Sequence, residues 1–84
     1  MTELQLYKYI REEFRPAEDE LAWDGDKLIL QINPINLHDF MCFVGEDNSE
    51  CPIKITYYHN RVQIDLVPIC EAFSIDPENI LVRE

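Results

Sequence analysis

Two stretches of the chain alternate apolar and polar residues on both sides of a tight turn, and this pattern restricts the fold more than any other feature. In the first stretch, the runs 21–23 and 27–32 flank Asp24-Gly25-Asp26. Glycine adopts the positive φ that short hairpin turns require, so this stretch predicts a β-hairpin. The second stretch, residues 53–66, alternates in the same way around His59-Asn60 and predicts a second hairpin with one face toward solvent.

The alternation also assigns each strand residue to one face of the sheet, because successive side chains of a strand point to opposite sides. Leu21, Trp23, Leu28 and Leu30 share one face, and we expect Trp23 to lie in the main core beside Leu30 and Ile64. The opposite face then presents Ala22, Ile29, Gln31, Thr56, Tyr58, Gln63 and Asp65.

A first helix is predicted before the first hairpin. Thr2 is followed three residues later by Gln5, which is the pattern of a capping box. Leu6 and Ile10 continue the chain at helical spacing. We expect this helix to end before Pro16.

Further helices are predicted after each hairpin. Asn36 suits the N-cap of a second helix that continues to Val44, and Gly45 suits the left-handed residue that ends a helix. Pro68 suits the first turn of a short third helix. Residues 80–82 are predicted to form a short extended tail.

The two halves of the chain match when one is shifted by 34 residues, which suggests an internal repeat. Part of this match is only the shared alternation, but the steps Pro34-Ile35 and Pro68-Ile69 also coincide. A strand-strand-helix repeat is therefore a hypothesis. With or without it, we predict an α+β fold in which two hairpins form a four-stranded, mainly antiparallel sheet with helices packed on one face.

The size and charge of the chain limit its organisation and its partners. We expect residues 1–84 to form a single small acidic domain, because 84 residues lie within the range of one domain. With 17 Asp and Glu against 7 Lys and Arg, the net charge of −10 would repel phosphates, which argues against direct binding of DNA or RNA. Either solubility or a surface for a basic partner explains the acidity, and the sequence leaves both open.

The location of the protein is predicted from its cysteines and its apolar runs. Three cysteines are an odd number, and no signal-like segment opens the chain. The apolar run at residues 40–44 is far shorter than the roughly 20 residues of a membrane span. We therefore expect a cytoplasmic protein without membrane contact.

Candidate catalytic and metal-binding residues each have a simpler structural explanation. His38 and Cys42 are spaced so that both could bind one metal ion, but zinc needs further ligands and no paired spacing supplies them. We expect Cys42 and Cys70 to be small core residues and His38 to lie at the surface. Cys70, near a helix start, is the best candidate nucleophile, yet an acidic surrounding opposes the thiolate.

Cofactor binding and carboxylate chemistry are disfavoured in the same way. Asp24 and Asp26 flank Gly25 in a predicted turn, where aspartate is expected for conformational reasons. Gly25 and Gly45 are the only glycines, so a phosphate-binding glycine loop is excluded. We predict that the protein is not an enzyme and has no catalytic, cofactor-binding or metal-binding residues.

The interpretation favoured by the sequence is a small adaptor or regulatory domain that acts through protein contacts. Exposed apolar or tyrosine-bearing patches are typical of interfaces, and the predicted partner-binding residues are Ile29, Gln31, Thr56, Tyr58 and Gln63. A first alternative is an acidic mimic of nucleic acid that inhibits a basic enzyme, using Glu12, Glu13, Glu18, Asp19, Glu20, Asp24 and Asp26. A second alternative is a homo-oligomer that pairs through a sheet edge or the open face.

The cysteine and histidine spacing leads to a prediction about metal content. Elemental analysis of the purified protein is expected to find no stoichiometric metal. One zinc per chain would contradict this interpretation of the spacing.

Overall fold

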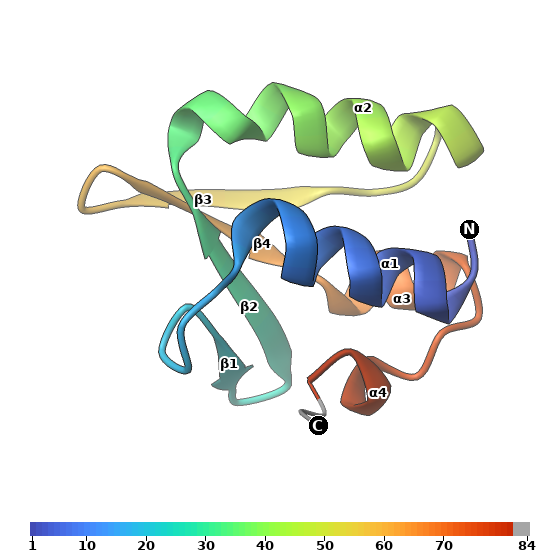
Figure 1. Cartoon of the computed structure of the whole chain (residues 1–84), viewed down its shortest axis with the longest axis horizontal. Coiled ribbons are helices and arrows are strands. Elements are labelled where there is room, and N and C mark those ends of the chain that lie inside the picture. Colours follow the sequence, from blue (N-terminus) through green and yellow to red (C-terminus); the bar gives the residue numbers. More distant parts are fainter. Residues whose placement is uncertain (82–84) are drawn as a thin grey trace.

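The computed structural model describes residues 1–81 and shows an α+β fold (Figure 1), as the sequence predicts. Each predicted hairpin forms and is followed by at least one helix. In chain order the elements are helix α1 (Glu3–Tyr9), π-helix η1 (Ile10–Phe14), strands β1 (Leu21–Asp24) and β2 (Lys27–Ile32), 3-10 helix η2 (Pro34–Asn36), helix α2 (Leu37–Asp47), strands β3 (Lys54–Tyr58) and β4 (Arg61–Asp65), and helices α3 (Val67–Ala72) and α4 (Pro77–Leu81).

The four strands form one antiparallel sheet in the order β1-β2-β4-β3. The two hairpins meet through β2 and β4 at its centre, where Leu30 lies opposite Ile64. These two residues are also equivalent under the shift of 34 residues, so the pairing agrees with two related hairpins that face each other. The repeat itself stays a prediction.

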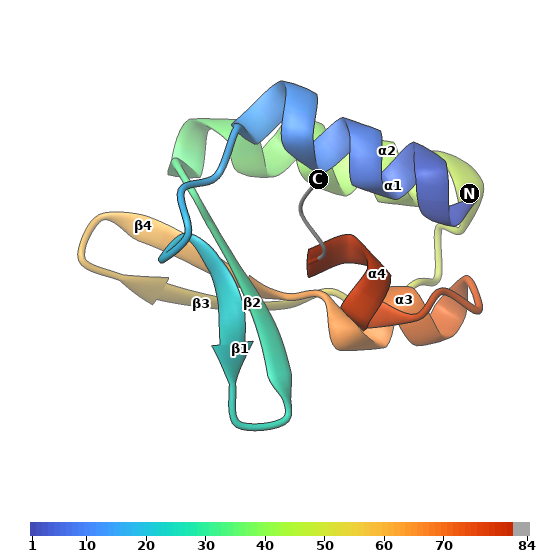
Figure 2. The ribbon, with the colours of Figure 1, turned by 60° about the horizontal axis from the view of Figure 1, so that its bottom comes forward.

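The helices lie on one face and at one end of the sheet. Helices α1 and α2 run side by side over the sheet, and α3 and α4 lie beyond the end of β4 (Figures 1 and 2). The space between these layers holds one cluster of buried apolar side chains, in which Phe40 of α2 is the largest. The cluster includes Leu6, Ile10, Leu21, Leu28, Leu30, Ile32, Val44, Val62, Ile64, Leu66, Ile69, Cys70, Ile75 and Ile80.

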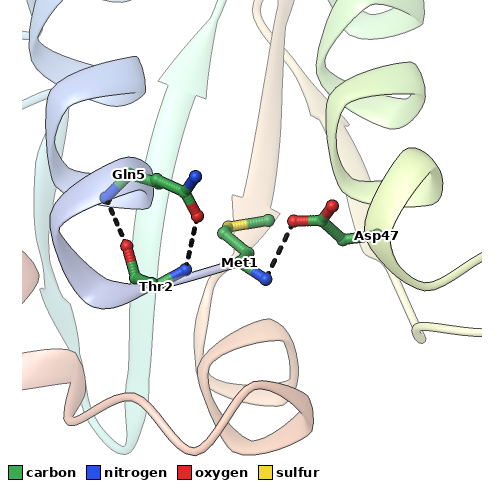
Figure 3. A network of polar contacts seen from close by, with 4 residues as sticks. All are labelled: Met1, Thr2, Gln5 and Asp47. Atoms are coloured by element: carbon green, nitrogen blue, oxygen red, sulfur yellow. Dashed lines mark hydrogen bonds and ion pairs between the residues drawn. The ribbon is translucent and has the colours of Figure 1, made fainter.

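The start of α1 is fixed by the predicted capping box. The backbone N–H of Thr2 donates to Oε1 of Gln5 at 2.7 Å, and the N–H of Gln5 donates to Oγ1 of Thr2 at 3.2 Å (Figure 3). The amino group of Met1 lies 2.9 Å from the carboxylate of Asp47 at the end of α2. The helical segment ends at Arg15, whose φ of 42° is left-handed, so it stops before Pro16 as expected.

The predicted extended tail is wrong for the part that lies within the described residues. Ile80 and Leu81 belong to α4, and Val82 lies outside the described part of the chain. The guanidinium of Arg11 donates to the carbonyl oxygens of Ile80 and Leu81 at 3.1 and 3.2 Å. This contact between distant segments satisfies carbonyls that a helix end leaves without partners, and a local sequence pattern does not show it.

The second helix differs from its prediction at both ends. It continues past Gly45 to Asp47, and the N–H of Asn48 donates to the carbonyl of Val44. Gly45 therefore lies inside α2 and does not end it. At the other end, Asn36 makes no capping bond with its side chain. Instead, the side chain of Asn33 caps the preceding 3-10 turn by accepting from the N–H of Ile35 at 3.1 Å.

Trp23 has the predicted strand register but not the predicted burial. It lies opposite Leu28, so it shares the face of Leu30 and Ile64. However, it is 36% exposed, whereas Leu30 and Ile64 are fully buried. Trp23 lies next to the turn of the first hairpin, and this end projects away from the helices (Figure 2). The helices therefore leave part of the indole uncovered, and the expectation of a core tryptophan is wrong.

The contrast between Leu30 and Trp23 predicts unequal effects of truncation. Leu30→Ala should lower the free energy of unfolding by about 2–5 kcal/mol, because it removes fully buried methyl groups and leaves a cavity. Trp23→Ala should lower it clearly less. Urea unfolding of both variants and the wild type tests this, and a larger loss for Trp23→Ala would contradict the burial described above.

Candidate functional site

The face of the sheet opposite α1 and α2, which we call the open face, brings together all five predicted partner-binding residues. Gln31 of β2 lies opposite Gln63 of β4, and Gln63 lies opposite Thr56 of β3. These three side chains therefore form a row across the sheet, with Ile29 on one side of it and Tyr58 on the other. Ile29, Gln31 and Gln63 are half-buried, whereas Thr56 and Tyr58 are exposed. Their role in binding stays a prediction.

The open face carries two hollows that share Asp24, Ile29 and Gln63. The first is lined by Asp19, Ala22, Asp24, Ile29, Gln31 and Gln63, and also by Trp23, which has the register of the opposite face but lies in the edge strand β1. The second is lined by Asp24, Lys27, Ile29, Lys54, Thr56, Gln63 and Asp65. The face thus has neutral side chains at its centre and charges of both signs around them.

Lys27 and Lys54 belong to this face, although the sequence interpretation did not include them. Lys27 is two residues before Ile29, and Lys54 is two residues before Thr56. The same alternation that placed Ile29 and Thr56 on the open face would have placed both lysines there.

Asp65 also belongs to the open face but has a structural role. Its side chain is only 8% exposed, and Oδ1 accepts a hydrogen bond from the N–H of Val67 at 3.1 Å. That N–H belongs to the first turn of α3, where backbone donors lack partners within the helix. Asp65 therefore joins the end of β4 to the start of α3.

The acidic residues that a nucleic-acid mimic would use are found in different surroundings. Asp19 and Asp24 line the first hollow of the open face. Glu20 pairs with Arg61 at 3.0 Å. Glu12 lines a separate groove between α1 and α2.

The groove between α1 and α2 is a second surface feature, which the sequence interpretation missed. It is lined by Gln5, Lys8, Tyr9, Glu12, Phe43, Glu46 and Asp47. The rings of Tyr9 and Phe43 stack at its base, with centroids 3.7 Å apart and an interplanar angle of 4°. Burial, followed by the charges of Glu13, Asp39 and Cys42, raises the pKa of Tyr9 to about 12. The stacked rings join the two helices, so we assign this groove to packing.

The cysteines only partly occupy the predicted positions. Cys70 is buried as expected, but Cys42 is exposed, so the prediction of a core residue is wrong there. The Sγ atom of Cys42 lies 3.5 Å from Nε2 of His38, which is at the surface as expected. Burial, followed by nearby carboxylates of which Asp76 has the largest effect, raises the pKa of Cys70 from 9.0 to about 11. Cys70 thus remains a neutral thiol near pH 7, which is unsuited to a nucleophile.

Among residues 1–81, no group of three or more His, Cys, Asp or Glu side chains could hold a metal ion. In the same part of the chain, no helix has both the length and the apolar character needed to cross a bilayer.

The raised pKa of Cys70 predicts a loss of stability at alkaline pH. Below about pH 9, Cys70 is protonated in both the folded and the unfolded chain. Between about pH 9 and 11, the unfolded chain loses this proton while the folded chain retains it, so rising pH favours unfolding. The stability of the wild type relative to Cys70→Ala should therefore fall across this interval. Urea unfolding at several pH values measures it, and a constant difference would contradict the prediction.

Comparison with known proteins does not place this chain in a family. The chain matches no protein-family model, no curated protein and no solved structure. The function must therefore be inferred from the chemistry of the open face.

Proposed function

We propose that this protein is a small, non-catalytic adaptor or regulatory domain that acts in the cytoplasm and binds a protein partner through its open face. The observation that carries the proposal is the location of Ile29 and Tyr58. Tyr58 is 56% exposed and Ile29 is half-buried, and both lie on the side of the sheet away from α1 and α2. Neither side chain is needed to fill the core.

The composition of the open face suits a protein partner. Interfaces have a desolvated centre with few charges, a polar rim, and an enrichment in tyrosine. Here Gln31 and Gln63 provide neutral hydrogen-bonding groups at the centre, and Thr56 continues this row to the edge strand β3. Lys27 and Lys54 lie outside this row, toward the rim of the open face.

The shape of the open face supports the same conclusion. Sites for small molecules enclose most of their ligand, whereas both hollows on this face are partly open to solvent. A flat partner surface can cover Ile29, Gln63 and Tyr58 together. We attribute the net charge of −10 to solubility.

The proposal predicts that Tyr58 contributes much of the binding energy. A partner captured by the immobilised chain from its native cell extract is identified by mass spectrometry, purified, and used for affinity measurements. Tyr58→Ala should weaken binding about thirtyfold, since a buried aromatic anchor contributes about 2 kcal/mol or more. Tyr57→Ala is the matched control, because Tyr57 is the adjacent exposed tyrosine on the opposite face.

Two further measurements separate the open face from other surfaces. Ile29→Ala, in the central strand β2, should also weaken binding, whereas Ile35→Ala should not, since Ile35 lies in η2 outside the sheet. Raising the salt concentration should change the affinity little, because neutral residues form the centre of the face. A tenfold loss with salt and no effect of Tyr58→Ala would contradict the proposal and favour the acidic mimic.

A further inference from the structure

The two edges of the sheet differ sharply in charge. The β1 edge is bordered by the carboxylates of Asp24 and Asp26, whereas Glu20, just before the strand, pairs with Arg61 of β4. The β3 edge belongs to residues 51–64, which contain none of the 17 acidic residues of the chain, and its strand carries Lys54. Charged side chains on an edge strand are a common protection against pairing with another chain. The β1 edge has this protection from two carboxylates, whereas β3 carries a single charged residue, Lys54, at its start.

The β3 strand is also open to solvent along its length. It is last in the sheet order, and within residues 1–81 it pairs only with β4. Every residue of β3 except the half-buried Ile55 is exposed, and Tyr57, which shares the face of the helices, is 70% exposed. Isoleucine, threonine and tyrosine favour strands, and β3 contains no proline.

The turn between β3 and β4 determines which backbone groups of β3 point outward. His59 and Asn60 both have positive φ, at 49° and 63°, as a two-residue type I′ turn requires. In such a hairpin the residues that flank the turn, Tyr58 and Arg61, form a hydrogen-bonded pair, and the pattern alternates along the strands. The N–H and C=O groups of Ile55 and Tyr57 therefore point away from β4 toward the free edge.

We propose that β3 pairs in antiparallel fashion with β3 of a second copy of this chain, with the two-fold axis at Thr56. In this register Ile55 lies opposite Tyr57 of the second copy, so their outward backbone groups face each other and can form hydrogen bonds in both directions. The two Thr56 side chains lie opposite each other at the axis. A register centred on Thr56 pairs all five residues of β3, and any other register leaves part of the strand unpaired.

The side chains of β3 are complementary to themselves in this register. On the helix side, the half-buried Ile55 contacts the exposed ring of Tyr57 from the second copy, which is a favourable pair of a β-branched and an aromatic residue. On the open face, the ammonium of Lys54 lies opposite the ring of Tyr58, where a cation can interact with the π-system. No like charges oppose each other, and this self-complementarity identifies the occupant of the edge as a second copy.

The dimer forms through backbone groups at the β3 edge and needs no partner protein, although Thr56 and Tyr58 of β3 also belong to the predicted partner-binding residues. The four strands of each copy would form one continuous sheet, with the two open faces next to each other on one side. The purified chain alone is sufficient to test the dimer, so its failure can be distinguished from a failure of partner binding.

A charge-swap experiment at Thr56 tests the dimer. The wild type should have the mass of two chains by light scattering at concentrations where Thr56→Glu alone and Thr56→Lys alone have the mass of one. Each variant places like charges opposite each other at the axis, and we expect at least tenfold weaker self-association. An equimolar mixture of the two variants should recover the mass of two chains, and native mass spectrometry should show one chain of each kind.

The recovery in the mixture shows that both variants remain folded and that Thr56 faces its own equivalent. Leu4→Glu and Leu4→Lys are the matched controls, because Leu4 is 61% exposed on α1, outside the sheet. Both controls should retain the wild-type mass. A wild type with the mass of one chain at every concentration, dimers of Thr56→Glu alone, or no recovery in the mixture would each overturn the proposal.

Discussion

The pairing of β2 with β4 is the interaction on which the rest of the structure depends. Each hairpin by itself is a two-stranded element of marginal stability, and the β2–β4 pairing joins both into one sheet with Leu30 opposite Ile64. The N–H of Leu66 donates to the carbonyl of Leu28 at 2.8 Å, which extends this contact to the start of α3. The resulting apolar face is wide enough to be covered by α1 and α2.

Coverage by helices makes the two faces of the sheet different. One face excludes water around Phe40 and the apolar residues of the central strands. The other keeps Ile29 and Tyr58 accessible, and these residues are the reason for proposing a protein-binding role. The same sheet order leaves β1 and β3 as edges, so the face and the edge are separate consequences of one topology.

The acidic residues are unevenly distributed over the two edges of the sheet, and this distribution is more informative than the net charge. Carboxylates border the β1 edge, and Glu20 pairs with Arg61, whereas residues 51–64 have no acidic residue. A strongly negative molecule repels its copies in general. The acid-free β3 edge is where that repulsion is weakest, which agrees with the self-pairing proposed above.

Local patterns in the sequence determined the elements and the two faces of the sheet. The alternation around Gly25 and around His59-Asn60 specifies the hairpins, and the capping box of Thr2 and Gln5 specifies the start of α1. The five residues predicted for partner binding lie on one face for the same reason, since the two-residue period of a strand is a local property. This covers most of the fold and the composition of the candidate site.

The tertiary structure decided what depends on contacts between distant segments. Trp23 has the predicted register but lies where the hairpin projects beyond the helices, so its side chain is partly exposed. Helix α2 continues past Gly45, and its Phe43 stacks on Tyr9 of α1. The end of the described chain is helical in α4, where Arg11 donates to the carbonyl oxygens of Ile80 and Leu81. The sheet order, and with it the exposure of the β3 edge, also comes from the meeting of two hairpins. Local periodicity specifies the direction in which a side chain points. Whether that side chain is buried, and where a helix ends, depends on contacts with distant segments of the chain.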